Sequence, residues 1–273
     1  MLVLALPIGL LIGLTLGSLG GGGSILTVPA LVYLLGQDPH AATTSSLLIV
    51  GVTALAGMAT HYRAGRVRVV QGLVFGALGI AGSYVGSKSS AAVAPATLLA
   101  ALSVLMLVVA AMMLARRRAQ LRAVTAGNVE AGSHDGPILQ LRPKLICNWP
   151  QVLKVLVTAS AVGLLTGFFG VGGGFVVVPA LVLVLGFTTP VAVGTSLLVI
   201  TINCTSALLP RMGQGVQLDW LPIGVFTLAA VGGSLLGGRL VTRMRPRRLT
   251  SAFTVLLVAV ALYTAARSFP QLV

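Results

Sequence analysis

Two clusters of glycine are the residues of this sequence whose type and spacing point most directly to chemistry. The first is Gly20–Gly23, followed by Ser24, and the second comprises Gly170 and Gly172–Gly174. Glycine leaves the backbone bare, so its N–H groups can approach a ligand closely. An apolar segment follows each cluster, and we expect it to form a short helix. The free N–H groups and the positive dipole end at the start of such a helix favour an anion.

Polar side chains lie in the first turns of the helix that we expect after each short helix. Ser46 and Thr53 share a face at helical spacing, and Ser196 and Asn203 do so 150 positions later. Uncharged donors on one stripe suit an oxyanion that must be bound and then released. The candidate substrate-binding residues are therefore Gly22, Gly23, Ser24, Ser45, Ser46, Thr53, Gly172, Gly173, Gly174, Thr195, Ser196 and Asn203.

Packing offers another interpretation of the same residues. Gly9, Gly13 and Gly17 form a stripe of small residues, which is typical of closely packed membrane helices. An exposed stripe of this kind would allow a homodimer. Serine and threonine hydroxyls can also bond to the preceding helical turn or link two helices. Packing explains runs of consecutive glycines poorly, so we favour binding at the clusters, whereas both interpretations stand for the hydroxyl side chains.

Other chemistries find few residues to support them. The acidic residues lie in expected loops or at helix ends, and they are Asp38, Glu130, Asp135 and Asp219. Without a carboxylate deep in the bilayer, a cation carrier or a carboxylate proton relay is not supported. No catalytic residue, metal site or cofactor is predicted. His61 ends an apolar run and is expected at the membrane interface, and Cys204 is expected to be a small packing residue.

The composition indicates whether water or lipid surrounds the helices that carry these residues. Among 273 residues, 56% are hydrophobic and only 8% are charged, whereas a soluble protein keeps roughly a quarter of its residues charged. The sequence therefore predicts an all-α integral membrane protein surrounded by lipid. The net charge of +14 does not indicate nucleic-acid binding, because basic residues of membrane proteins collect in cytoplasmic loops.

The chain divides into two membrane regions joined by a polar linker. We expect membrane regions at 1–115 and 150–273 and a linker at 116–149. The apolar runs at 2–36 and 150–186 contain the glycine clusters and exceed the roughly 20 residues of one crossing.

The two regions are predicted to be repeats. The segment GLTLGSLGGGGSILTVPALVYLLG at 13–36 aligns without a gap with GLLTGFFGVGGGFVVVPALVLVLG at 163–186. We expect each repeat to hold a glycine-broken hairpin or discontinuous helix plus three membrane-spanning helices, with the short helix after the clusters ending at Gly36 or Gly186.

The orientation of the repeats follows from their basic loops. If each long segment turns back at its glycines, the repeats are inverted, and the Arg-rich loops at 63–68 and 239–248 share a face with the linker. The other face keeps only Lys88, Arg211 and Arg267. The positive-inside rule favours this arrangement over parallel repeats and makes the linker cytoplasmic.

The duplicated glycine motif, each copy followed by a T-S-L-L or S-S-L-L segment, resembles the TauE/SafE family of sulfite exporters over nearly the whole chain apart from the linker. The resemblance implies a multi-pass permease of a prokaryotic plasma membrane that carries small sulfur-containing anions, such as sulfite or sulfonates. The first copy reads GGGGS where the second reads GVGGG, so Ser24 replaces a glycine.

The leading hypothesis is a transporter that holds an anion at the repeat interface and alternates its access. An anion channel or uniporter with the same site is the first alternative. A membrane sulfur-transfer enzyme that uses Cys204 is the second, although no acid or base is near Cys204 in the sequence. The sequence alone does not specify the anion, the energy coupling or the oligomeric state.

Overall fold

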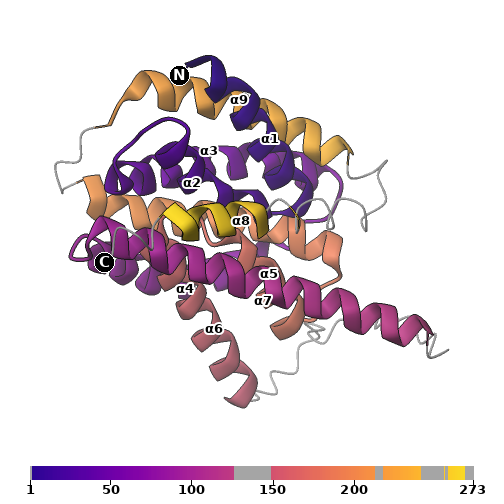
Figure 1. The fold of residues 1–273 in the computed structure, drawn as a ribbon. Coiled ribbons are helices and arrows are strands. Elements are labelled where there is room, and N and C mark those ends of the chain that lie inside the picture. Colours follow the sequence, from indigo (N-terminus) through magenta and orange to yellow (C-terminus); the bar gives the residue numbers. More distant parts are fainter. Residues whose placement is uncertain (1, 126–148, 213–217, 241–254, 256–257, 268–273) are drawn as a thin grey trace.

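The computed structural model describes residues 2–125, 149–212, 218–240, 255 and 258–267. Regular structure in these residues is helical, as predicted (Figure 1). In chain order the elements are α1 (Leu2–Leu19), the 3₁₀ helix η1 (Gly22–Leu26), α2 (Thr27–Tyr33), α3 (Pro39–Arg63), α4 (Val69–Ser90), α5 (Pro95–Thr125), α6 (Trp149–Phe169), α7 (Gly174–Val184), α8 (Thr189–Met212) and α9 (Trp220–Leu240), and a shorter apolar helix spans Val258–Arg267.

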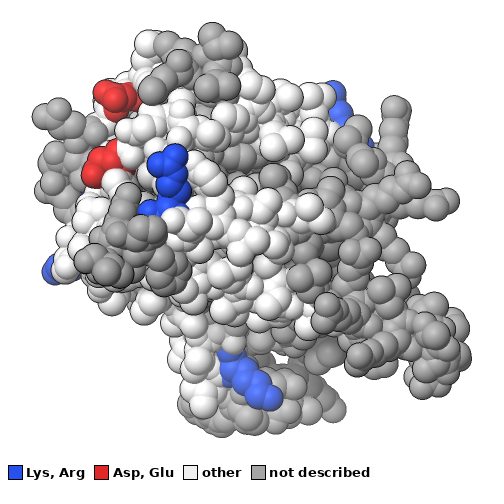
Figure 2. Space-filling view, viewed as in Figure 1, with Lys and Arg blue, Asp and Glu red and all other residues white. Residues whose placement is uncertain are grey.

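Five of these helices are long and apolar enough to cross a membrane. They are α3, α4, the Pro95–Met112 part of α5, α8 and α9. The described surface in Figure 2 carries few charged side chains, as expected for a face that contacts lipid. Helix α5 continues to Thr125, so the predicted boundary at 115 falls inside a helix. The remainder of the predicted linker up to 148 lies outside the described residues.

Both glycine clusters interrupt the helix that leads into them. Gly20 and Gly170 have φ values of 64° and 65°, in the left-handed region where a Cβ atom is unfavourable. After each interruption the chain folds back, and a Cβ atom at Gly173 would collide with the hydroxyl of Thr166 on α6. We call 20–24 the first break and 170–174 the second break. The predicted discontinuities are therefore present in both halves.

The two breaks are followed by different helices. The second leads directly into α7, whereas the first continues as the five-residue 3₁₀ helix η1 before α2 begins at Thr27. The expectation of one regular short helix after each cluster is therefore right for the second half only. The short helices end as predicted, because Gln37 N donates to Leu31 O and Phe187 N donates to Leu181 O around a glycine of positive φ.

Small residues bring α1 against α9 and α4 against α6. A Cβ atom at Gly13 of α1 would collide with the carbonyl oxygen of Ala230, and one at Gly86 of α4 with that of Leu164. Figure 1 shows α1 and α9 side by side. The glycine stripe of α1 is therefore buried within the chain. It is not an exposed surface for a second copy, so the homodimer loses the observation on which it was predicted.

Helices α3 and α8 cross next to the breaks and run in opposite directions. Position 51 of α3 lies beside Cys204 of α8, and position 57 lies beside Leu197. The N-cap Asp38 fixes the start of α3 by accepting hydrogen bonds from His40 N and Ala41 N, at 2.9 and 3.3 Å. This antiparallel pair forms the frame on which most of the predicted polar residues lie.

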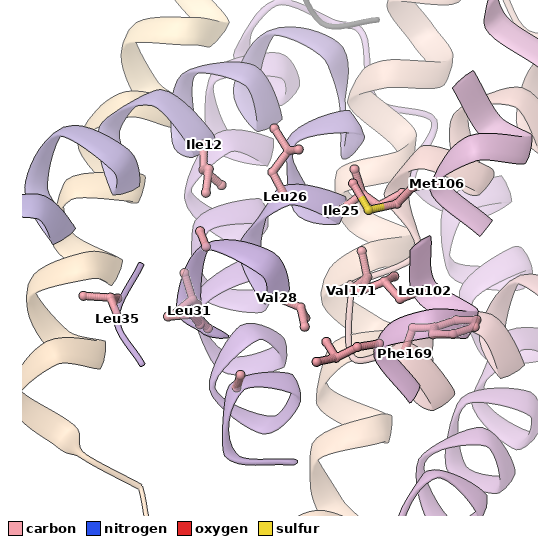
Figure 3. Packing of buried hydrophobic residues seen from close by; sticks show 14 of the residues in the cluster. Ile12, Ile25, Leu26, Val28, Leu31, Leu35, Leu102, Met106, Phe169 and Val171 are labelled. Carbon is pink, nitrogen blue, oxygen red and sulfur yellow. The ribbon is translucent and has the colours of Figure 1, made fainter. Parts of the chain in front are cut away.

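Apolar side chains surround the breaks. Ile25 and Val171 come from the two halves of the chain. In Figure 3 they lie next to Leu102 and Met106 of α5, and all four belong to one hydrophobic cluster. All four side chains are fully buried. The unwound backbone is thus enclosed by protein, as it must be at membrane depth.

Candidate functional site

The two breaks touch each other. A Cβ atom at Gly21 would collide with the Cα atom of Gly174, so only glycine allows the two backbones to meet in this way. The Cδ1 atom of Ile200 on α8 lies 2.6 Å from the Cβ position of both glycines and covers the contact. The structure therefore brings the two glycine clusters into contact at Gly21 and Gly174.

The amide groups of these breaks have unused hydrogen bonds. Within the described chain, no acceptor takes a hydrogen bond from the amides of Gly22, Gly23, Gly172 and Gly173. The four residues are buried. Buried backbone N–H groups are almost always paired, because leaving one unpaired costs about as much as a lost hydrogen bond. Each of the two breaks thus carries unpaired donors, and an anion is the ligand that such donors favour.

Two predicted serines shape the first break. The hydroxyl of Ser24 donates to the carbonyl oxygen of Gly21 at 2.6 Å. The Oγ atom of Ser196 on α8 lies 3.0 Å from Gly20 O and 2.7 Å from Val193 O. These hydroxyls turn the carbonyl groups of the break toward themselves, so both serines position the backbone whose amides are free.

Three predicted residues are buried without partners. In the described part of the chain, the Oγ atom of Ser46, the Oγ1 atom of Thr53 and both amide atoms of Asn203 have no hydrogen bond. Their side chains are at most 1% exposed. An unpaired hydroxyl or amide costs roughly 1–3 kcal/mol, so three such side chains on α3 and α8 are unusual. The amide of Asn203 lies against α4, with its Oδ1 atom 2.7 Å from a Cβ position at Gly79.

The last two predicted residues lie toward the helix ends. Ser45 lines a pocket of about 230 Å³ together with Leu35, Gly36, Gln37, Asp38, Ala41 and Asp219. Two carboxylates make this pocket unfavourable for an anion, although the Oγ atom of Ser45 has no partner among the described residues. Thr195 accepts a hydrogen bond from Arg68 N at 3.1 Å. Among the described residues, no hydrogen bond therefore links Ser45 or Thr195 to the breaks.

Sequence reasoning missed two buried basic residues. Arg211 was expected in a loop and His61 at the membrane interface, and neither was expected to be enclosed by protein, but each side chain is only 2% exposed. His61 Nε2 lies 2.8 Å from Gly17 O, and Arg211 Nη2 donates to Gly167 O at 2.8 Å. Both pairs are separated by 44 residues in sequence. His61 and Arg211 occupy equivalent positions of the two aligned segments, 150 residues apart. This equivalence was the sequence signal that could have indicated a shared structural role.

Cys204 has the environment of a packing residue. Its side chain is 1% exposed, and its Sγ atom would lie 3.4 Å from a Cβ atom at Gly172. Among the described residues, histidine, cysteine and acidic side chains form no group of three that could hold a metal ion. These contacts provide no general base or acid for sulfur-transfer chemistry at Cys204.

Known proteins resemble the chain over its whole length. Residues 5–264 match the family described as sulfite exporter TauE/SafE. A probable membrane transporter protein of Xylella fastidiosa (strain 9a5c) is 32% identical over 100% of this chain and 98% of its own length. The probable membrane transporter protein YunE of Bacillus subtilis (strain 168) is 30% identical over 87% of this chain and 86% of its own length. No solved structure matches.

These similarities agree with the helices of the structure. The match begins in α1 and ends in the helix Val258–Arg267, so it includes both breaks and the α3–α8 pair. The chain is a multi-pass membrane protein, and it belongs to the TauE/SafE family of sulfite exporters.

Proposed function

We propose that this transporter carries small sulfur-containing anions, such as sulfite or organosulfonates, and binds them where the two glycine breaks meet. The observation that carries this proposal is the set of four unpaired, buried amides at Gly22, Gly23, Gly172 and Gly173. An oxyanion accepts several N–H groups at once, and donors fixed by the fold need no reorganisation to receive it.

Side chains complete the proposed site. Ser46, Thr53 and Asn203 add donors that have no other partner in the described chain. None of them is charged, so the anion is held by hydrogen bonds and can be released again. Ser24 and Ser196 support the site by fixing the first break.

The arrangement of the helices supports two inverted repeats. Helices α3 and α8 occupy corresponding places in the two halves and run antiparallel. The burial pattern is the same at every position of 41–50 and 191–200. In inverted-repeat transporters the substrate lies at the repeat interface, and rocking of one repeat against the other alternates access. We infer the same cycle here, with the linker on the cytoplasmic side of a plasma membrane.

Asn203→Leu tests the site. The amide of Asn203 has no partner, so its removal is expected to leave the thermal stability of the purified protein unchanged or higher. Sulfite affinity, measured by calorimetry, is expected to fall by about 10-fold or more. The matched control is Thr205→Val, because Thr205 is exposed on the same helix and bonds only to Thr201 O. Unchanged affinity in Asn203→Leu would place the anion elsewhere.

A flux measurement separates the carrier from a channel or uniporter that uses the same site. In liposomes loaded with unlabelled sulfite, a carrier accelerates uptake of labelled sulfite by exchange, and the rate saturates. A channel gives no such acceleration. Absence of sulfite and sulfonate flux in both formats would contradict the proposed transport activity.

A further inference from the structure

Arg211 carries a buried charge that the described protein does not neutralise. Its guanidinium belongs to the last turn of α8 and is 2% exposed. The described carboxylates, Asp38 and Asp219, are both exposed and neither pairs with it. A buried charge without a counter-charge is costly, so its retention points to an anionic partner that the described residues do not supply.

Uncharged oxygens surround this guanidinium. Its Nε atom donates to Ser87 Oγ at 2.9 Å, and its Nη2 atom donates to Ser90 Oγ at 2.8 Å. Its Nη1 atom donates to the hydroxyls of Thr43 and Thr44. Nη2 also reaches Gly167 O at 2.8 Å. The acceptors come from α3, α4 and α6, so four helices meet at this one side chain.

The hydroxyls around Arg211 can exchange their roles. At present they donate their protons to backbone carbonyls: Thr43 and Thr44 to His40 O, Ser87 to Ala207 O and Ser90 to Ser87 O. A hydroxyl rotates freely, so it can instead donate to an anion, which a carbonyl cannot do. An oxyanion beside the guanidinium would replace neutral acceptors by charge-assisted bonds, which are roughly twice as strong.

This cluster adjoins the second break. Gly167 and Phe168, which both accept from Arg211, are among the last residues of α6 before the break. The Cβ atom of Thr43 would lie 2.6 Å from a Cβ atom at Gly170. Only residues 169–171 separate Phe168, which contacts the guanidinium, from the free amides of Gly172 and Gly173. Thr43 contacts both the guanidinium and Gly170, so it forms a second link between Arg211 and the second break.

We propose that Arg211, with the hydroxyls of Thr43, Thr44, Ser87 and Ser90, is a second binding station for the transported anion, which serves as its missing counter-ion. This station selects negative charge at the N-terminal end of α3, and the uncharged amides of the breaks then receive the anion. The inference rests on the proposed function, and it adds a charged specificity residue that the site at the breaks does not contain.

Sulfite titration of purified variants tests this station. Arg211→Gln removes the charge and is expected to weaken sulfite affinity about 10- to 100-fold, because bonds to charged groups are the stronger class. Arg211→Lys keeps the charge but loses the fork of donors, and a smaller loss of about 3- to 10-fold is expected. Arg267→Gln is the matched control, since Arg267 is exposed and lies over the Tyr263 ring. It should bind sulfite as the unmodified protein does.

Each outcome has a distinct meaning. Wild-type affinity in a folded Arg211→Gln variant would make Arg211 purely structural and overturn the station, while loss of affinity in Asn203→Leu would still support the site at the breaks. If Arg211→Gln does not fold, Arg211→Lys and Ser90→Ala decide, and wild-type affinity in both overturns the proposal. If the unmodified protein binds neither sulfite nor methanesulfonate, the proposed function fails and the station fails with it.

Discussion

The two ends of the α3–α8 pair hold basic residues at corresponding positions but in unequal surroundings. His61 ends α3 and contacts the carbonyl of Gly17, whereas Arg211 ends α8 and donates to that of Gly167, both at 2.8 Å. Each contact ties the last turn of one helix to the residues just before a glycine break. The two halves thus make equivalent side chain–carbonyl contacts, one with an imidazole and the other with a guanidinium.

The surroundings differ in their hydroxyl groups. Arg211 is enclosed by the hydroxyls of Thr43, Thr44, Ser87 and Ser90. The positions 150 residues away have no hydroxyl, and they are Val193, Gly194, Gly237 and Leu240. The Nδ1 atom of His61 has no partner in the described chain. A permanent cation needs permanent acceptors, whereas an imidazole can be neutral and does without them. The comparison therefore assigns a fixed charge to one end only.

The largest effect is expected where the two halves agree, at Gly20 and Gly170. An alanine at either position would have positive φ, at a cost of about 1–2 kcal/mol. At Gly170 its Cβ atom would also lie 2.5 Å from Thr43 O, and at Gly20 it would lie 2.7 Å from Val193 Cα. With overpacking included, each substitution should destabilise the fold by about 2–5 kcal/mol, measured by thermal unfolding in detergent.

Gly232→Ala on α9 is the control for these two substitutions. No described residue lies within 4 Å of its Cβ position, and it lies in a regular helix. Alanine there should be neutral or stabilising by up to about 1 kcal/mol. If Gly170→Ala were as stable as Gly232→Ala, the second break would not have the backbone conformation described above.

The fold was predictable from the sequence where one residue type has one physical meaning. Consecutive glycines in an apolar run predicted the breaks, and Asp38, expected in a loop or at a helix end, caps the start of α3. The helix against which the glycine stripe at Gly13 packs was not predictable. Its partner Ala230 is more than 200 residues away, and a stripe of small residues does not indicate which helix it contacts. Buried hydroxyls such as Ser46 and Ser196 look the same in sequence, yet only Ser196 has partners.

The basic residues show the limit of charge-based reasoning. An arginine after an apolar run is normally assigned to a loop. The positive-inside rule counts the charges beside each membrane segment and does not consider whether a side chain points into the protein. Arg211 instead lies inside the protein, since acceptors on α3, α4 and α6 are available there. Those acceptors are distant in sequence, so only the three-dimensional packing could reveal them.

A coupling measurement at Arg211 would sharpen the comparison. Ser90→Ala removes an acceptor from a buried cation and should destabilise the fold by about 1–3 kcal/mol. In an Arg211→Met background the same change should cost little, because the serine then bonds only to Ser87 O. The double-mutant cycle, measured by chemical denaturation, should give a coupling energy of about 1–2 kcal/mol.

Ser83→Ala provides the control for the cycle. Ser83 lies on the same helix, is fully buried and donates to Ile80 O without contacting Arg211. Its effect should add to that of Arg211→Met within about 0.5 kcal/mol. A coupling at Ser83 as large as that at Ser90 would show that the cycle measures general repacking of α4 and not the hydroxyl–guanidinium contact.

The smallest effect is expected at the other end, with His61→Gln, and His61→Leu serves as its comparison. Glutamine can place its amide N–H near the carbonyl of Gly17, so the free energy of unfolding should change by less than about 1 kcal/mol. Leucine leaves that carbonyl without the contact and should cost about 1–3 kcal/mol. Since the positions equivalent to the four hydroxyls around Arg211 are Val193, Gly194, Gly237 and Leu240, neither variant should show the coupling expected at Arg211. Equal loss in both variants would mean that the imidazole, through Nδ1, does more than hold Gly17.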